Sequence, residues 1–373
     1  MSWILDGLAD LHGALRADGY TVIGPTHRDG AIVLAELASA DDLPYGWGVT
    51  LEPGGYRTRR RDDDAAFAHS AGPQSWKPFL HPPRVKLWEG RRTEDGGFSI
   101  QEAEDTPPRY AFLGVRPCDL RAIGVLDHVM TGGAHPDEAY GARRTGAFII
   151  AVNCTEPGET CFCASMGTGP RADAGYDLAL TEVIGEGRFL VEVGTSAGTA
   201  MLERIPHEEA DETTTERALA EVAAAADRMG RQMPEPEGLR DLLAGSLDAA
   251  RWDDVASRCL TCGNCTMVCP TCFCTTVEDV TDLTGEHAER WQRWDSCFDL
   301  DFSHLPGGSV RTSGKSRYRQ WLTHKLGTWH DQFGSSGCVG CGRCIVWCPV
   351  GIDLTEEVAA LREEREEQRG KSE

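Results

Sequence analysis

Short hydrophobic runs alternate with helical stretches and turn residues through the N-terminal part of the chain. Runs rich in β-branched and aromatic residues are typical of strands, and they occur at residues 20–24, 31–37, 110–115, 147–152 and 188–193. A helix is expected over 119–130, directly after the third of these runs. This alternation predicts a mixed α/β domain.

The chain then changes character. Residues 208–229 are rich in Ala and Glu, which predicts a helix with Asp211 or Thr213 as its cap. The next segment, 230–238, is polar and carries two prolines, so we place a domain boundary there. The remainder reads as mostly helical, and we expect an α+β fold. The predicted domains are residues 1–232, mixed α/β, and residues 233–373, α-helical.

Charge and cysteine content narrow the possible functions. The chain has 37 Lys and Arg against 59 Asp and Glu, a formal net charge of −22, which argues against nucleic acid or an anionic membrane as a partner. No stretch approaches the roughly 20 apolar residues that span a bilayer, and the first residues lack the features of a signal peptide. We therefore expect a cytoplasmic protein, in which the 15 cysteines bind metal rather than form disulfides.

Eight cysteines form two runs with the same spacing, C-x2-C-x2-C-x3-C-P, the pattern of ferredoxins that hold two [4Fe–4S] clusters. In that pattern three cysteines bind one cluster and the fourth binds the other. Residues 233–373 are thus expected to form a ferredoxin-type domain with two [4Fe–4S] clusters. The ligands of cluster 1 are predicted to be Cys259, Cys262, Cys265 and Cys348. Those of cluster 2 are predicted to be Cys338, Cys341, Cys344 and Cys269.

Zinc is the alternative metal, because it also uses C-x2-C pairs. A zinc site takes four ligands, which would leave four of these eight cysteines unexplained, so we favour the clusters. The glycines in the runs, Gly263, Gly340 and Gly342, are expected to let the backbone approach the cluster sulfides closely.

Seven cysteines lie outside the runs. Cys118 and Cys154 each end a predicted strand, and Cys161 and Cys163 follow within one short loop. The four thiols would suit a third [4Fe–4S] cluster or a zinc ion, although buried cysteines without a metal are also common; we favour the cluster. The other three cysteines are one fewer than the four ligands of a [4Fe–4S] cluster, so we expect them to pack near the clusters. They are Cys272, Cys274 and Cys297.

A basic segment, residues 311–325, stands out in this acidic chain. It would raise the cluster potentials or dock an acidic partner, or it is simply an exposed basic face. Its cations are Arg311, Lys315, Arg317, Arg319 and Lys325. The chain has no phosphate-binding loop, and G-x-G-x-x-A at 167–172 does not bridge a strand and a helix. One-electron centres without a hydride-accepting cofactor require partner subunits.

Several segments resemble one protein family: GVRPCDLRAI, NCTEPGETCFCASMGTGP, the two cysteine runs and RYRQWLTHK. They are similar to the beta subunit of cytoplasmic NAD(P)-linked nickel-iron hydrogenases (sulfhydrogenases) and to the related iron–sulfur subunit of anaerobic sulfite reductase. The resemblance implies a complex with a flavin-containing NAD(P)H reductase subunit. A small iron–sulfur subunit and a nickel-iron catalytic subunit, or a sirohaem sulfite reductase subunit, would complete it.

Together these features predict an electron-transfer subunit without catalytic residues of its own. It is expected to relay electrons between an NAD(P)H-linked flavin subunit and the catalytic subunit of a hydrogenase complex. The alternatives are the corresponding electron-transfer subunit of an anaerobic sulfite reductase, a flavin-binding oxidoreductase in its own right, and a zinc-stabilised scaffold.

Overall fold

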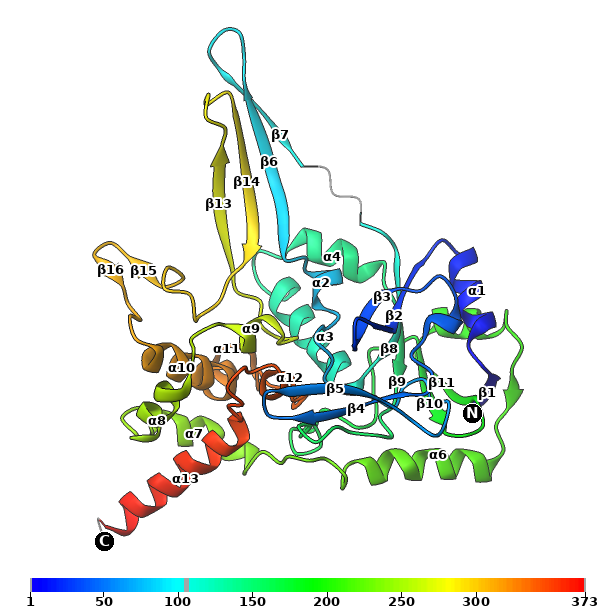
Figure 1. Cartoon of the computed structure of the whole chain (residues 1–373). Coiled ribbons are helices and arrows are strands. Elements are labelled where there is room, and N and C mark those ends of the chain that lie inside the picture. The colour runs from blue at the N-terminus through cyan, green and yellow to red at the C-terminus, as the bar shows by residue number, and fades with distance from the viewer. Residues whose placement is uncertain (1, 104–106, 372–373) are drawn as a thin grey trace.

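The computed structural model describes residues 2–103 and 107–371, and its largest element is an eight-stranded sheet in the N-terminal part (Figure 1). The strand order is β12-β1-β11-β10-β9-β8-β2-β3. Neighbours among β2, β8, β9 and β10 are parallel, and the remaining strands join them antiparallel. The strands are β1 (Trp3–Asp6), β2 (Thr21–Arg28), β3 (Ala31–Glu36), β8 (Tyr110–Val115), β9 (Phe148–Val152), β10 (Leu178–Val183), β11 (Arg188–Val193) and β12 (Glu208–Glu209).

Both faces of this sheet are covered. Along β9, Ile150 and Val152 belong to the core beneath α1 and α5, whereas Ile149 and Ala151 belong to the core beneath α3 and α4. A strand buried on both faces reads as a continuous apolar run, which explains why this strand was recognisable in the sequence. The helices of this part are α1 (Ala9–Ala17), η1 (Ala40–Asp42), α2 (Lys77–Leu80), α3 (Pro117–Thr131), α4 (Glu138–Thr145), α5 (Ser196–Leu202) and α6 (Glu212–Ala225).

Two of the helix predictions can be checked closely. The helix expected after the third strand is α3, and it begins immediately beyond β8. Asp211 is the cap of α6, because its side chain accepts a hydrogen bond from the Thr214 N–H at 2.8 Å. The mixed α/β character of the N-terminal part is thus confirmed.

A second sheet projects from the body of the molecule as a narrow arm (Figure 1). Its order is β13-β14-β6-β7, so strands from distant parts of the chain pair at its centre. The sequence analysis expected mostly helix after residue 238 and missed β13 and β14. Both strands are polar and largely half-exposed, so they lack the apolar alternation that reveals a strand. The strands are β6 (Arg84–Arg92), β7 (Phe98–Glu102), β13 (Thr275–Thr281) and β14 (His287–Trp294).

The C-terminal part is mainly helical and packs around a core that includes Trp252, Leu326 and Val358. This arrangement confirms the predicted α+β class. The predicted boundary at 232/233 falls in irregular chain between α6 and η2, and it stays a prediction because the arm joins strands from both sides of it. The elements are η2 (Pro236–Gly238), α7 (Leu239–Ala244), α8 (Arg251–Arg258), α9 (Asn264–Met267), β15 (His304–Leu305), β16 (Gly308–Ser309), α10 (Gly314–Thr323), the π-helical turn η3 (His324–Thr328), α11 (Trp329–Phe333), α12 (Arg343–Val346) and α13 (Leu354–Gly370).

The two parts are joined by buried contacts. Arg343 of α12 makes a two-bond ion pair with Asp119 of α3, at 2.6 and 2.8 Å, and both side chains are almost fully buried. The hairpin of β4 (Trp47–Glu52) and β5 (Gly55–Arg60) packs its apolar residues against α12. Within the described residues, no helix is both long enough and apolar enough to cross a membrane.

Candidate metal centres

The four cysteines predicted for cluster 1 line a single cavity. Cys259 ends α8, Cys262 and Cys265 flank the start of α9, and Cys348 comes from the second run. Backbone N–H groups point at two of the sulfurs, from Thr261 to Cys259 at 3.4 Å and from Ile352 to Cys348 at 3.3 Å. The rest of the cavity is mostly apolar, with Phe298, Tyr318, Trp321 and Leu354 among its walls.

The cysteines predicted for cluster 2 also lie close together. Burial raises the pKa of the Cys344 thiol, and the neighbouring thiols of Cys338 and Cys341 raise it further. Cys269, from the first run, adds to the same effect. The sulfur of Cys338 accepts a hydrogen bond from the N–H of Gly340 at 3.5 Å. Three cysteines of one run and the fourth of the other therefore meet in each case.

The glycines of the second run allow close backbone contacts that the sequence analysis did not predict. Gly340 and Gly342 have φ values of +66° and +74°, which favour glycine. A Cβ at Gly340 would lie 2.6 Å from the backbone of Cys163, and one at Gly342 would lie 2.4 Å from the Thr160 carbonyl oxygen. These glycines therefore allow the N-terminal cysteine loop to press against the second run.

Lys325 is buried beside the second set of thiols, so it is not available to a docking partner. Only 3% of the residue is exposed, and its ammonium donates to the Cys269 sulfur at 3.2 Å and to the carbonyl oxygen of Gly337 at 3.1 Å. Burial opposes the charge, but the thiolates of Cys269 and Cys272 outweigh it and raise the pKa of Lys325. The cation thus faces cysteines that are predicted to bind cluster 2, and a cation at that position would raise the cluster potential.

The other cations of the basic segment are partly buried, and several are used within the fold. The Arg317 guanidinium donates to the carbonyl oxygens of Arg311 and Phe298, and Arg319 donates to that of Leu247. Lys315 pairs with the largely exposed Asp253 at 2.8 Å. A docking role for Arg311, Lys315, Arg317 and Arg319 stays a prediction.

The four N-terminal cysteines converge at one edge of the large sheet. Strands β8 and β9 are parallel neighbours, so Cys118, in the first turn of α3, and Cys154, just after β9, meet at the same edge. Cys161 and Cys163 complete the group, and all four line one small cavity. Burial raises the pKa of the Cys161 thiol to about 12. Cys341 of the second run lines the same cavity.

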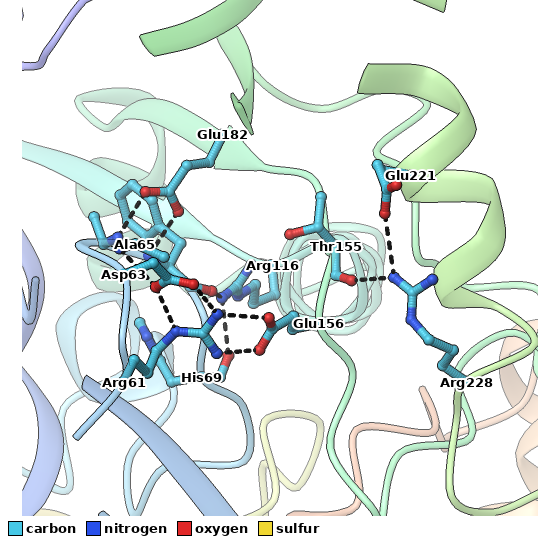
Figure 2. Close-up of polar contacts among 12 residues, drawn as sticks. Arg61, Asp63, Ala65, His69, Arg116, Thr155, Glu156, Glu182, Glu221 and Arg228 are labelled. Carbon is cyan, nitrogen blue, oxygen red and sulfur yellow. Dashed lines mark hydrogen bonds and ion pairs between the residues drawn. The ribbon is translucent and has the colours of Figure 1, made fainter. Parts of the chain in front are cut away.

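Polar contacts hold the loop that carries these cysteines (Figure 2). Arg61 bridges Asp63 and Glu156, with N–O distances of 2.6 and 2.5 Å, so it fixes the loop just after Cys154. Arg228, near the end of α6, donates to the carbonyl oxygen of Thr155 at 2.6 Å. The loop is therefore held from two sides before any metal is bound.

The spacing of the cysteine sulfurs separates clusters from zinc. Zinc holds sulfur at about 2.3 Å, so the sulfurs of one site lie within about 4 Å of one another. In the part of the chain that the structure describes, no three cysteine sulfurs lie within 4.8 Å of one another. No three sulfurs are therefore grouped as closely as a single zinc ion requires, whereas a cubane spreads its ligands more widely. Thiolate donors, sets of four and this wide spacing all fit [4Fe–4S] clusters.

One compact ligand group was not anticipated from the sequence. Glu89, His287 and Glu289, on β6 and β14, bring three ligand atoms within 4.8 Å. Lys86 already donates to Glu89 at 2.9 Å and to Glu289 at 2.6 Å. This ammonium neutralises the carboxylates, so we interpret the group as an ion-pair network that links two strands of the arm.

The three cysteines that we expect to pack near the clusters lie around one cavity. Cys272, Cys274 and Cys297 line a cavity of about 600 Å³ at the foot of the arm. No sequence pattern indicated this cavity, because it is formed by chain segments on both sides of β13 and β14.

Comparison with known proteins agrees with this geometry. The profile of the 4Fe-4S dicluster domain family matches residues 258–352, which confirms the two predicted [4Fe–4S] clusters. Sulfhydrogenase 2 subunit beta of Pyrococcus furiosus is 35% identical to the chain over 280 residues, covering 73% of the chain and 81% of that relative. No solved structure matches the chain.

Proposed function

Because the chain belongs to the family of sulfhydrogenase beta subunits, we propose that it is an electron-transfer subunit of a hydrogenase complex. Its two clusters, when bound, supply one-electron carriers. On this proposal the chain connects an NAD(P)H-linked flavin subunit with a nickel-iron catalytic subunit and its small iron–sulfur subunit. The name of the P. furiosus relative favours the hydrogenase over the sulfite reductase alternative.

The observation that carries this proposal is a continuous row of thiol sites. Cys341, a predicted ligand of cluster 2, also lines the cavity of the four N-terminal cysteines. Cys344, from the same set, lines the cavity of the cluster 1 cysteines. The cluster 2 site therefore lies between the other two, and the row runs from the large sheet to the helical part. A subunit that connects two partners needs sites arranged in this way.

The proposal assigns the ligands as the sequence pattern suggested. Cluster 1 is held by Cys259, Cys262, Cys265 and Cys348, and cluster 2 by Cys338, Cys341, Cys344 and Cys269. The shared lining of the first cavity by residues of both runs supports this crossed arrangement. The proposal also places a third [4Fe–4S] cluster at the four converging thiols of Cys118, Cys154, Cys161 and Cys163.

The third cluster predicts a loss of iron on mutation. The double variant Cys154→Ser/Cys161→Ser of the full chain is expected to bind about four fewer irons than the wild type after anaerobic reconstitution. Both residues are buried and line the same cavity, so the serines would leave only two thiolate donors there. Iron and sulfide analysis measures the loss. Wild-type iron content in this variant, or stoichiometric zinc in the wild type, would contradict a third cluster.

A break in the middle of the row tests the function itself. We expect Cys338→Ser/Cys344→Ser to abolish H₂-dependent reduction of NAD(P)⁺ by the affinity-purified complex. The two partial reactions should persist, because their centres lie in other subunits. They are measured as H₂-dependent viologen reduction and NAD(P)H-dependent dye reduction.

The partial reactions are the internal control for assembly. If the double variant assembles and still couples H₂ to NAD(P)⁺ at the wild-type rate, this chain is not the relay. If the purified complex contains a sirohaem subunit instead of a nickel-iron subunit, the sulfite reductase alternative holds.

A further inference from the structure

The cavity at the foot of the arm is built around three cysteines that the proposed relay does not use. Cys272 and Cys274 follow the first cysteine run, and Cys297 lies shortly after β14. The first pair of the arm, Thr275 opposite Trp294, fixes the two segments side by side. Just below it, the Asp295 N–H donates to the Cys274 carbonyl oxygen at 2.8 Å. The arm therefore holds the three cysteines on one cavity wall.

A carboxylate completes a set of four donors. Asp295 lines the same cavity and is only 9% exposed. Its Oδ1 accepts a hydrogen bond from the Ser296 N–H at 2.7 Å, and within the described residues its Oδ2 has no hydrogen-bond or ion-pair partner. The Oδ2 atom is not fully buried, so it is accessible from the cavity, and carboxylates are ligands for iron. Oδ2 is thus available as a fourth ligand atom.

Two buried lysines lie next to the cavity, and they differ in what balances their charge. Lys77 and Lys325 are each 3% exposed, and neither has a carboxylate within 4.0 Å among the described side chains. The Lys77 ammonium donates to the Cys272 carbonyl oxygen at 3.0 Å, and Lys325 itself lines the cavity. The Cys269 sulfur lies beside Lys325 and stabilises its charge, whereas Lys77 has no such partner among the described side chains, and a buried charge without a counter-charge is strongly unfavourable. An iron–sulfur cluster with four anionic ligands would supply the missing negative charge.

The size of the site selects a cluster over a single ion. The cavity volume is about 600 Å³, and its three thiols are not within the 4.8 Å that would suit one zinc ion. Aromatic side chains form much of the remaining wall, among them Phe273, Trp321 and Trp329. Trp321 also lines the cavity of cluster 1, so the two sites are adjacent.

We propose that Cys272, Cys274, Cys297 and Asp295 bind a further [4Fe–4S] cluster, separate from the two dicluster sites and from the N-terminal thiol site. This centre lies to one side of the row, next to the sites of clusters 1 and 2. The row of electron-transfer sites would then have a side branch, which ends at the foot of the arm. The proposal stands independently of the hydrogenase assignment, because it rests only on this chain's residues.

The test uses the full chain, reconstituted anaerobically with iron and sulfide. Cys274→Ser/Cys297→Ser is expected to bind about four fewer irons and to lose one redox centre by EPR-monitored titration. Cys272 is left in place because its thiol contacts Cys269, whose loss would disturb cluster 2. Asp295→Cys should keep the iron and change the potential and EPR signal of that centre, whereas the exposed Asp299→Asn should change neither.

Three outcomes would overturn the proposal. The first is a double variant with wild-type iron and spectra. The second is loss of the cluster 1 or cluster 2 signal in place of an additional one. The third is an Asp295→Cys protein with spectra identical to the wild type, which would remove Asp295 from the ligand set. Circular dichroism of each variant checks that the chain is folded.

Discussion

Replacing Cys259 or Cys348 with serine is expected to remove the same redox centre, although the two residues belong to different runs. Both line the cavity of cluster 1, and each sulfur accepts a backbone hydrogen bond there. Loss of one of four thiolates should strip or convert the cluster, so the effect on its signal should be complete. EPR spectra of the dithionite-reduced full-length variants, with iron analysis, would show which centre is lost.

Cys344 provides the matched control. It lies four residues before Cys348 and lines the same cavity, yet it is assigned to cluster 2. Cys344→Ser should therefore remove the signal of cluster 2. The single variant Cys269→Ser should remove that same signal. The crossed assignment would be wrong if Cys348→Ser and Cys344→Ser eliminated one and the same signal while Cys259→Ser eliminated another.

Asp119→Asn is expected to destabilise the folded chain by about 3–5 kcal/mol, because it leaves the buried Arg343 guanidinium without its counter-charge. The two side chains are 3% and 8% exposed and are joined by two hydrogen bonds. A lowering of the apparent Tm on the order of 5–10 °C should result, measured by calorimetry at one scan rate. The same change should loosen the contact between the large sheet and the second cysteine run.

Asp253→Asn is the control, because it removes an ion pair of similar length that is largely exposed. That substitution should cost about 1 kcal/mol or less. In Asp119→Leu/Arg343→Met both charges are gone, and the protein should recover much of the lost stability. Equal Tm values for Asp119→Asn and Asp253→Asn would show that the buried pair contributes little.

The sequence was most informative where one local rule dominates. The spacing of the two cysteine runs predicted the dicluster domain because cluster ligation fixes the separation of the thiols. The apolar run at 147–152 predicted β9 because that strand is buried on both faces. Asp211 was recognisable as a cap because a carboxylate accepts a hydrogen bond from the first turn of a helix.

Features that depend on distant contacts were not accessible. The pairing of β6 with β14 joins polar segments far apart in the chain. The cavity of Cys274 and Cys297 forms where the paired strands β13 and β14 meet the helical segment that carries Trp321 and Trp329. The approach of Gly340 to Cys163 is likewise a product of the tertiary fold.

Lys325 is an instructive case, because the sequence did carry a signal for its position. The basic segment suggested an exposed surface, yet Tyr318, Trp321, Leu322 and Lys325 follow the i, i+3, i+4, i+7 spacing of one helical face. Three of the four are large apolar residues that the structure buries. The helical period therefore placed Lys325 in the core, and net charge alone was a poor guide to its environment.

The pairing across the arm also has a consequence for biosynthesis. β6 leaves the ribosome about 200 residues before its partner β14, a delay of roughly 10–40 s at a translation rate of about 5–20 residues per second. Through that interval the newly made β6 and β7 hairpin has no neighbour on its β6 edge. The cysteine loop at Cys163 waits almost as long, about 180 residues, since Gly340 covers it only when the chain is nearly finished. Delivery of iron and sulfide to these sites is thus a late event, and the scaffold proteins that perform it would meet an almost complete polypeptide.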